Sequence, residues 1–453
     1  MTATLSRLSE AQQLNAPTLH QLDNGLTIIA EQVPVDAVNL SVWLNVGSAR
    51  EAHAINGMAH FLEHMVFKGT PRLRSGEFEQ LIEARGAVTN AATSQDYTYY
   101  YVTSAPQDFA ELAPLQLDVV FNAAIPDDAF EQERLVVLEE IRRSQDSPQR
   151  RVFQQAMEVA FEQLPYRRPI LGPAEVVGQL RPQQMRNFHQ FHYSPEAMTV
   201  VAVGNLPAEE LVRVVADSTA ELMQDRPLPF SRNGNGNGHG SPENTEFETL
   251  WQAPATACEP AFSTQVRRET VDSTLRQARL VMMWRVPGLA QLEQTYALNV
   301  LAAVLGFGRM GRLIRDLREE RGLVSSIAVR NMTQSLQGTF YISAQLPAEN
   351  LEAVEAAIAH HIQRLHCELI AHADIERVRT QVANRFIFSN EAPSNRASLY
   401  GYYHAMLGDL QPALTYPSRL QDITTEDLQA AAQRYLSPDA YGITIQKPAQ
   451  SAS

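Results

Sequence analysis

Short apolar runs alternate along this chain with longer segments whose apolar residues recur at helical spacing. In the first half, runs at 26–30, 38–46, 98–104 and 198–203 predict strands. The segment 127–143 has helical periodicity, follows Pro126 and begins with Asp127 and Asp128, either of which can cap a helix start. Because helices and strands are mixed without strict βαβ alternation, we predict an α+β fold.

The same order of elements occurs twice. Trp43 and Trp284 lie 241 positions apart in similar apolar stretches. Four further matches follow in the same order, at offsets of 241 or 243: Thr98-Tyr99-Tyr100 with Thr339-Phe340-Tyr341, Pro106 with Pro347, Glu133-Arg134 with Glu376-Arg377, and Ser194-Pro195-Glu196-Ala197 with Ser437-Pro438-Asp439-Ala440. Five matches at nearly one offset indicate a duplicated domain.

A segment rich in asparagine and glycine separates the two copies. It reads SRNGNGNGHGSPEN and has no apolar face, so we predict a flexible, exposed linker. The predicted organisation is an N-terminal tail at 1–17, an α+β domain at 18–230, the linker at 231–257 and a homologous α+β domain at 258–453.

Composition narrows the range of functions. Hydrophobic residues make up 44% and charged residues 19%, which is ordinary for a globular protein and excludes disorder as the main state. The net charge of −14 disfavours a nucleic-acid partner and would favour basic peptides if it lined a binding chamber. Cys258 and Cys367 have no CxxC spacing, and we expect buried free thiols. With no signal-peptide core and no apolar stretch near the roughly 20 residues that span a bilayer, we expect a cytoplasmic protein without a membrane span.

The sequence GMAHFLEHMVF at 57–67 carries the strongest chemical signal. His60 and His64 are four residues apart, so on a helix both imidazoles project from one face and can bind one Zn²⁺. Glu63 can reach a metal-bound water, and H-x-x-E-H is the inverzincin signature. The alternative is a pair of buried histidines satisfied by protein groups. It is weakened because the matching residues of the second copy, 301–305, contain neither His nor Glu.

A third metal ligand is expected on the predicted helix 127–143. Glu133 and Glu140 are seven residues apart and project within about 20° of each other on a helix. The second copy retains Glu376 at the first position but has Ala383 at the second. Because this carboxylate is lost together with the histidines, we predict Glu140 as the third ligand and Glu133 as a residue that orients a ligand. A solvated pair of glutamates is the alternative.

The stretch HFLEHMVFKGT at 60–70, followed by ERLVVLEEI at 133–141, resembles the pitrilysin or insulinase family of zinc peptidases and its short, processing-peptidase-like branch. The resemblance covers roughly residues 18–450. It implies one Zn²⁺ per chain in the domain at 18–230, and a homologous domain without zinc at 258–453. It assigns the metal ligands as His60, His64 and Glu140, the general base as Glu63, and the second acid as Glu133.

Two further segments resemble family motifs that contact substrate. Asn90, in NAATS, matches an asparagine that helps to hold the substrate backbone, and a turn-forming asparagine is the alternative. Arg318 matches the arginine of an Arg–Tyr pair that grips substrate, but Ser325 stands where the tyrosine belongs. Arg318 could equally be a surface charge.

The resemblance also implies a partner. Short members of the family resemble half of a clamshell and enclose substrate as dimers. Since the tyrosine is missing here, we expect a heterodimer with a homologous chain that supplies the Arg/Tyr pair; the alternative is a homodimer that uses a tyrosine from 400–403. The predicted function is a zinc-dependent endopeptidase acting on short or unfolded peptides, in processing or clearance. A non-catalytic scaffold subunit and a peptide-binding subunit are the alternatives.

Overall fold

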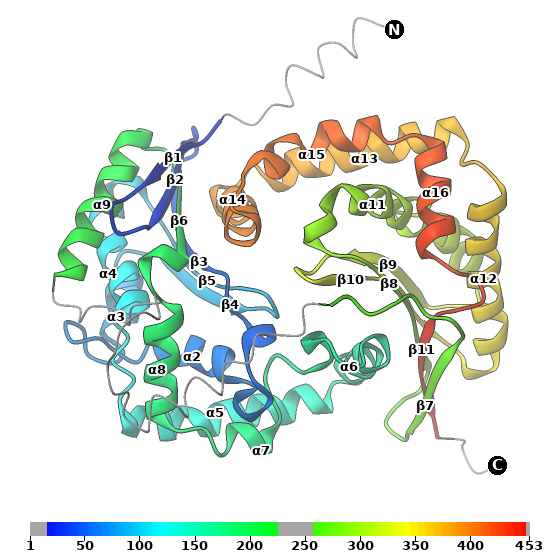
Figure 1. Ribbon diagram of the computed structural model, residues 1–453, viewed down its shortest axis with the longest axis horizontal. Coiled ribbons are helices and arrows are strands. Elements are labelled where there is room, and N and C mark those ends of the chain that lie inside the picture. The colour runs from blue at the N-terminus through cyan, green and yellow to red at the C-terminus, as the bar shows by residue number, and fades with distance from the viewer. Residues whose placement is uncertain (1–15, 225–256, 450–453) are drawn as a thin grey trace, which may run out of the picture. The chain divides into compact units, whose positions relative to one another are not determined.

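The computed structural model describes residues 16–224 and 257–449 (Figure 1). The predicted tail at 1–17 and the predicted linker at 231–257 therefore lie almost wholly outside the described residues. The described chain forms two compact units. The first contains residues 16–141, 169–224 and Ile387–Leu414, and the second contains Arg142–Arg168, 257–386 and 415–449.

The first unit is built on a six-stranded sheet in the order β1-β2-β6-β3-β5-β4. β2 and β6 are parallel and the other neighbours are antiparallel. β3 and β6 are buried along their whole length, which explains their nearly continuous apolar composition. The strands are β1 (Thr18–Gln21), β2 (Thr27–Gln32), β3 (Val38–Leu44), β4 (Val88–Thr93), β5 (Thr98–Ser104) and β6 (Met198–Gly204).

Helices α4 and α9 pack against this sheet and share its main apolar core. The helices assigned wholly or mainly to the first unit are α2 (Met58–Val66), α3 (Glu77–Ala84), α4 (Phe109–Phe121), α5 (Asp127–Asp146), α7 (Ala174–Val177), α8 (Pro182–His192), α9 (Ala208–Met223) and α14 (Pro393–Leu407). Its short 3₁₀ turns are η1 (Ser48–Arg50), η2 (His53–Ile55), η3 (Pro106–Asp108) and η5 (Pro195–Ala197).

The second unit is built on a five-stranded sheet in the order β7-β11-β8-β10-β9. Its strands are β7 (Val266–Asp272), β8 (Ala278–Pro287), β9 (Ser326–Met332), β10 (Gln337–Leu346) and β11 (Gly442–Pro448). Its helices are α6 (Pro148–Ala160), α11 (Leu292–Gly306), α12 (Leu351–Cys367), α13 (His372–Ser389), most of α15 (Gln411–Asp422) and α16 (Thr425–Tyr435). Shorter helical segments are η4 (Pro165–Arg167), η6 (Leu289–Gln291), η8 (Ala348–Asn350) and the π-helical η7 (Ile314–Glu320).

The duplication predicted from the sequence is visible in the sheets. The order β2-β6-β3-β5-β4 of the first unit recurs as β7-β11-β8-β10-β9 in the second. Trp43 opposes Tyr99 across β3 and β5, and Trp284 opposes Phe340 across the equivalent strands β8 and β10. The prediction of an α+β fold made of two homologous domains is confirmed.

Each sheet is also covered by a helix from the other half of the sequence. In the first unit, α14 packs on β3 and β6. In the second unit, α6 packs on β8 and β11. α14 can approach the sheet closely because Gly401 has no Cβ atom. A Cβ atom at this position would lie only 2.2 Å from the indole nitrogen of Trp43. The predicted boundaries, 18–230 and 258–453, follow chain order and do not include this exchange, since helical periodicity does not specify which sheet a helix covers.

The expectation of buried thiols is wrong, because both Cys258 and Cys367 are exposed. Cys367 is the last residue of α12, where the chain leaves the packed face of the helix. Cys258 lies beside the carbonyl oxygen of Leu336, at 3.3 Å. Within the described ranges, no helix has both the length and the apolar composition needed to cross a membrane.

Candidate metal centre

The start of helix α2 is held by a buried carboxylate. Gly57 adopts φ +101°, and a Cβ atom there would lie 2.6 Å from the Leu171 carbonyl oxygen, so glycine is required. The buried Glu51 carboxylate accepts hydrogen bonds from the backbone N–H of Gly57 and of Ala59, at 2.8 and 2.7 Å, and from the Asn56 amide. These bonds satisfy N–H groups that a helix start leaves unpaired, and so anchor the helix that carries the predicted histidines.

The three predicted ligands converge in the first unit. His60 and His64 lie on α2, and Glu140 lies on α5. The Nε2 atoms of His60 and His64 are 3.6 and 3.5 Å from Oε2 of Glu140. Two ligand atoms bound to a tetrahedral Zn²⁺ at about 2.1 Å lie about 3.4 Å apart, which both distances match. The ligand atoms of these three residues all lie within 4.8 Å of one another. No other group of three or more potential metal ligands is found in the described residues.

The chemistry of these side chains also fits a metal. His60 is only 7% exposed, and its Nδ1 atom has no hydrogen-bond partner among the described residues. Burial and, to a smaller extent, the neighbouring His64 together lower the pKa of His60 to about 3. The imidazole is therefore neutral, which is the form that coordinates a metal. Two imidazoles and one carboxylate are a typical ligand set for catalytic zinc.

Glu133 orients one of the histidines. Its Oε1 atom lies 2.9 Å from Nδ1 of His64, and its Oε2 atom accepts from the Lys68 ammonium at 2.7 Å. Burial raises the pKa of Glu133, but the hydrogen bonds from Lys68 and His64 outweigh burial and hold the pKa below its usual value. An ionised Glu133 accepts a hydrogen bond from Nδ1–H of His64, which leaves Nε2 unprotonated and free to bind a metal. Sequence reasoning missed Lys68, which lies just beyond the C-cap Phe67 of α2 and reaches Glu133 from there.

Glu63 lies on α2 beside the three ligands, with its carboxylate held by another element. The Thr93 hydroxyl, at the end of β4, donates to Oε2 of Glu63. Burial raises the pKa of Glu63, although the Thr93 hydrogen bond and the His64 imidazole oppose the rise. A carboxylate with a raised pKa is suited to accept and return a proton. Thr93 was also missed, although it belongs to the NAATS segment that contains Asn90.

Asn90 lies on an open sheet edge. Among the described strands β4 pairs only with β5, so its other edge is unpaired. The Asn90 side chain is exposed, and its Oδ1 accepts from the backbone N–H of Ala91 at 2.9 Å. Thr93, the last residue of β4, donates a hydrogen bond to Glu63. The unpaired edge of β4 therefore ends next to the Glu63 carboxylate.

The predicted substrate-contacting residues of the second copy belong to the second unit. Arg318 lies on the π-helical η7 and pairs with Glu319 at 2.6 Å. The Ser325 hydroxyl, next to β9, donates to the Gln277 side chain and to the Gln345 carbonyl oxygen, both at 3.0 Å. Of the tyrosines at 400–403, Tyr400 is fully buried and donates to Glu31, so it is not available to replace the missing tyrosine.

Comparisons with known proteins identify the family of this chain. Residues 26–174 match the family described as Insulinase (Peptidase family M16), and residues 179–382 match the Peptidase M16 inactive domain. An uncharacterized zinc protease of Mycobacterium bovis is 29% identical over 435 residues, which cover 96% of this chain and 93% of that protein. The uncharacterized zinc protease YmxG of Bacillus subtilis is 25% identical, with 94% of this chain and 97% of that protein covered.

A solved structure shares the fold. The crystal structure of a protease from Helicobacter pylori has a TM-score of 0.85 and 23% identity, and the match covers 96% of this chain and all of that one. The resemblance inferred from the H-x-x-E-H stretch and the distal glutamates is thus confirmed, and the chain belongs to the insulinase-type peptidase family M16.

Proposed function

We propose that this protein is a zinc-dependent endopeptidase that hydrolyses short or unfolded peptides, in processing or clearance. The observation that carries the proposal is the convergence of His60, His64 and Glu140 beside Glu63. The names of the relatives as zinc proteases support the same activity.

Zn²⁺, when bound by His60, His64 and Glu140, would activate a water and polarise the scissile carbonyl. Glu63 would take a proton from the attacking water and pass it to the leaving amine nitrogen. Thr93 holds the Glu63 carboxylate by its hydrogen bond, and Glu133 holds the His64 ring. The base and one ligand are thus oriented before substrate arrives.

The open edge of β4 provides a place for the substrate backbone. An extended peptide can add to an unpaired strand edge through main-chain hydrogen bonds. Asn90 lies on this strand, and we propose that it helps to hold the peptide. Only a chain free of its own tertiary structure can adopt the extended form, which is why we propose short or unfolded substrates.

The active form is proposed to be a dimer. Since Ser325 replaces the tyrosine of the family's Arg/Tyr pair, a homologous chain is the proposed source of both residues, with Arg318 of this chain as a weaker substitute. Hydrolysis that appears only when this chain is mixed with such a homologue would support the heterodimer. Full hydrolysis by the isolated chain would exclude it. A chain that binds peptides but never cleaves them, alone or mixed, would be the peptide-binding subunit instead.

The direct test is the Glu63→Gln variant. It should keep its zinc, because Glu63 is not one of the three ligands, while peptide hydrolysis should fall by about 10²- to 10⁴-fold. Zinc content by elemental analysis and cleavage of a fluorogenic peptide measure the two effects. Glu209→Gln, at an exposed glutamate on α9, is the control and should change neither. Normal hydrolysis by Glu63→Gln would remove Glu63 as the base.

A further inference from the structure

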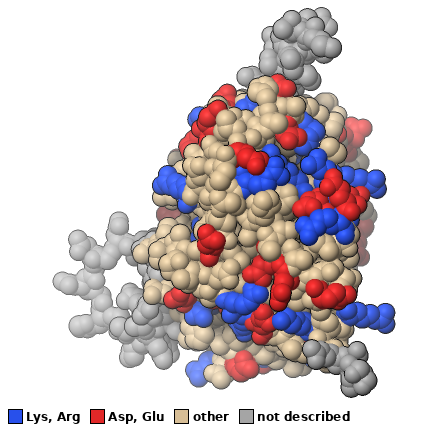
Figure 2. Space-filling view, turned by 90° about the vertical axis from the view of Figure 1, so that its right-hand side faces the viewer, with Lys and Arg blue, Asp and Glu red and all other residues tan. Residues whose placement is uncertain are grey.

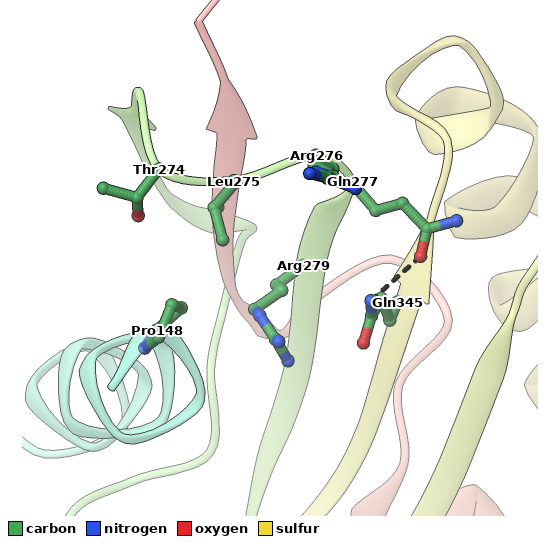
Figure 3. Close-up of a pocket in the computed structure, with 7 residues that line it drawn as sticks. All are labelled: Pro148, Thr274, Leu275, Arg276, Gln277, Arg279 and Gln345. Atoms are coloured by element: carbon green, nitrogen blue, oxygen red, sulfur yellow. Dashed lines mark hydrogen bonds between the residues drawn. The ribbon is translucent and has the colours of Figure 1, made fainter. Parts of the chain in front are cut away.

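The second unit contains a cavity of about 530 Å³ that the proposed peptidase site does not use. It lies between the β7–β8 turn, the adjoining ends of β8 and β10, and the start of α6 (Figure 3). The turn contributes Arg276 and Gln277, β8 contributes Arg279, and β10 contributes Gln345. None of these residues belongs to the metal centre.

Two guanidinium groups line this cavity without a counter-charge. The guanidinium groups of Arg276 and Arg279 form no hydrogen bond or ion pair with any of the residues that the structure describes. Arg276 is exposed, whereas Arg279 is half-buried and its Nε atom is fully buried. No acidic side chain lines the cavity. Asp272, the nearest acid along the chain, already accepts from Arg151 and from Thr274. A partly buried guanidinium without a partner is costly, so the cavity favours an oxyanion.

Gln345 adds an acceptor next to this positive charge. Its side chain lies directly across the β8–β10 pair from Arg279. Its Nε2 atom donates to Oε1 of Gln277 at 2.9 Å, and the Ser325 hydroxyl donates to the same oxygen at 3.0 Å. The bond to Gln277 fixes which end of the Gln345 amide is the NH2 group, so the Oε1 atom at the other end is available as an acceptor. A ligand that fills the cavity should therefore combine an oxyanion with an adjacent N–H group.

The start of α6 contributes further positive potential. Pro148, the first residue of this thirteen-residue helix, lines the cavity. A helix N-terminus carries a partial positive charge and favours anions. Leu275 and Pro148 also provide apolar contact for a side chain.

We propose that this cavity binds the C-terminal residue of a peptide. Arg279 and Arg276 would donate to the two carboxylate oxygens, and Oε1 of Gln345 would accept the backbone N–H of the same residue. The choice of a peptide over another oxyanion rests on the proposed peptidase function. The site would hold a substrate or product terminus, apart from the residues that cleave.

The test compares two peptides that differ only in a free carboxylate or an amide at the C-terminus. Each peptide is fluorescently labelled and titrated into the full chain carrying Glu63→Gln, so that binding is measured without cleavage. The free acid should bind about tenfold more tightly, the usual scale of a charge-assisted pair of hydrogen bonds. Arg279→Gln should abolish this preference, and Arg276→Gln should reduce it. Arg279→Lys, which keeps the charge but not the two-pronged geometry, should fall between them.

Controls separate the explanations. Arg364→Gln, at an exposed arginine paired with Glu368 on α12, should leave the preference unchanged. Inorganic phosphate should compete with the free acid but not with the amide. Equal binding of acid and amide peptides would overturn the proposal, as would a preference that survives Arg279→Gln in a folded protein. Phosphate binding that depends on Arg279 without any preference for the free acid would overturn the peptide assignment.

The outcome is distinguishable from failure of the proposed function. A chain that never hydrolyses peptides but shows the Arg279-dependent preference would support the cavity and exclude the peptidase. An active peptidase with no such preference would do the reverse.

Discussion

Helices α2 and α11 occupy equivalent places in the duplicated fold, yet only α2 carries a metal-binding pattern. In α2, His60, Glu63 and His64 interrupt an otherwise apolar, buried helix. In α11, the three matching residues are all apolar and buried: Leu301, Val304 and Leu305. The same backbone therefore packs well without the polar residues, which indicates that α2 keeps them for chemistry rather than for folding.

Helices α5 and α13 extend the comparison. Ala383 of α13 is buried where α5 has the proposed ligand Glu140. Glu376 matches Glu133 but is largely exposed, 3.4 Å from His372. The same residue type thus contacts the proposed ligand His64 in one unit and forms a surface pair in the other. The difference teaches that neighbours, rather than the glutamate itself, determine its role.

The largest expected effect comes from replacing the two histidines of α2 with the leucines found at the matching positions of α11. In the double variant His60→Leu/His64→Leu, zinc should fall from about one per chain to none, because two of three ligands are gone. Hydrolysis should be lost with it. Compared with the zinc-free wild-type protein, the thermal midpoint should be unchanged or higher, since two ionisable groups give way to apolar packing. The zinc-loaded wild type should be more stable than both, because the bound ion stabilises the native state. Zinc analysis and calorimetry measure these effects.

The control for this variant is His372→Leu, at an exposed histidine of α13 that should affect neither zinc nor hydrolysis. A double variant that still bound zinc tightly would show that the metal lies elsewhere.

Glu133 and Glu376 occupy matching positions, so substitutions at the two can be compared directly for their effect on zinc affinity. Glu133→Gln should weaken zinc binding by about 10- to 100-fold, because the ionised carboxylate that orients His64 is lost. Glu376→Gln should leave zinc affinity unchanged. Competition with a chelator measures both. Equal effects of the two substitutions would refute an orienting role for Glu133.

The starts of the two helices differ as well. Glu51→Gln should lower the free energy of unfolding by about 1–2 kcal/mol, because a buried carboxylate that accepts from the first turn of α2 becomes a neutral amide. Glu293 lies in the first turn of α11 but is largely exposed and pairs with Arg419, at 3.4 Å. Glu293→Gln should change stability by less than about 0.5 kcal/mol. Denaturant unfolding of both variants measures the two losses of unfolding free energy. Equal losses would contradict the prediction.

The smallest expected effect concerns a histidine that has no metal role. His361 is as buried as His60, at 7%, and its Nδ1 also has no partner in the described part of the chain. Its Nε2 instead lies 2.9 Å from Asp316. Burial lowers the pKa of His361 from 6.5, opposed by Asp316 and reinforced by Arg364 and His360.

Because the folded-state pKa of His361 is lowered, the unfolded chain binds more protons as the pH falls below 6.5, and stability is lost. His361→Gln should remove this loss, less than about 1 kcal/mol between pH 7 and 5.5, while retaining a donor to Asp316. Unfolding at a series of pH values measures it. The exposed His372→Gln should keep the wild-type slope, and an unchanged slope in His361→Gln would contradict the prediction.

Part of the site was accessible from the sequence because its geometry is local. The helical repeat alone places His60 and His64 on one face, and the loss of Glu140 together with the histidines in the second copy singles out that carboxylate. Lys68 lies beyond the end of α2, so the helical repeat does not place it beside Glu133. Thr93 could not be predicted either, because its contact with Glu63 depends on where β4 ends relative to α2.

The duplication, the α+β class and the candidate zinc ligands could be predicted from the amino-acid sequence alone. Repeats, apolar periodicity and i, i+4 spacing can all be read from the order of residues along the chain. Tertiary structure alone decided the 3.5–3.6 Å convergence on Glu140, the carboxylate of Glu51 beneath α2, the exchange of α6 and α14, and the exposure of both cysteines. It also decided the unpaired arginines of the cavity in the second unit. These features depend on how segments distant in the chain pack together, and packing is settled by the whole core rather than by any local pattern.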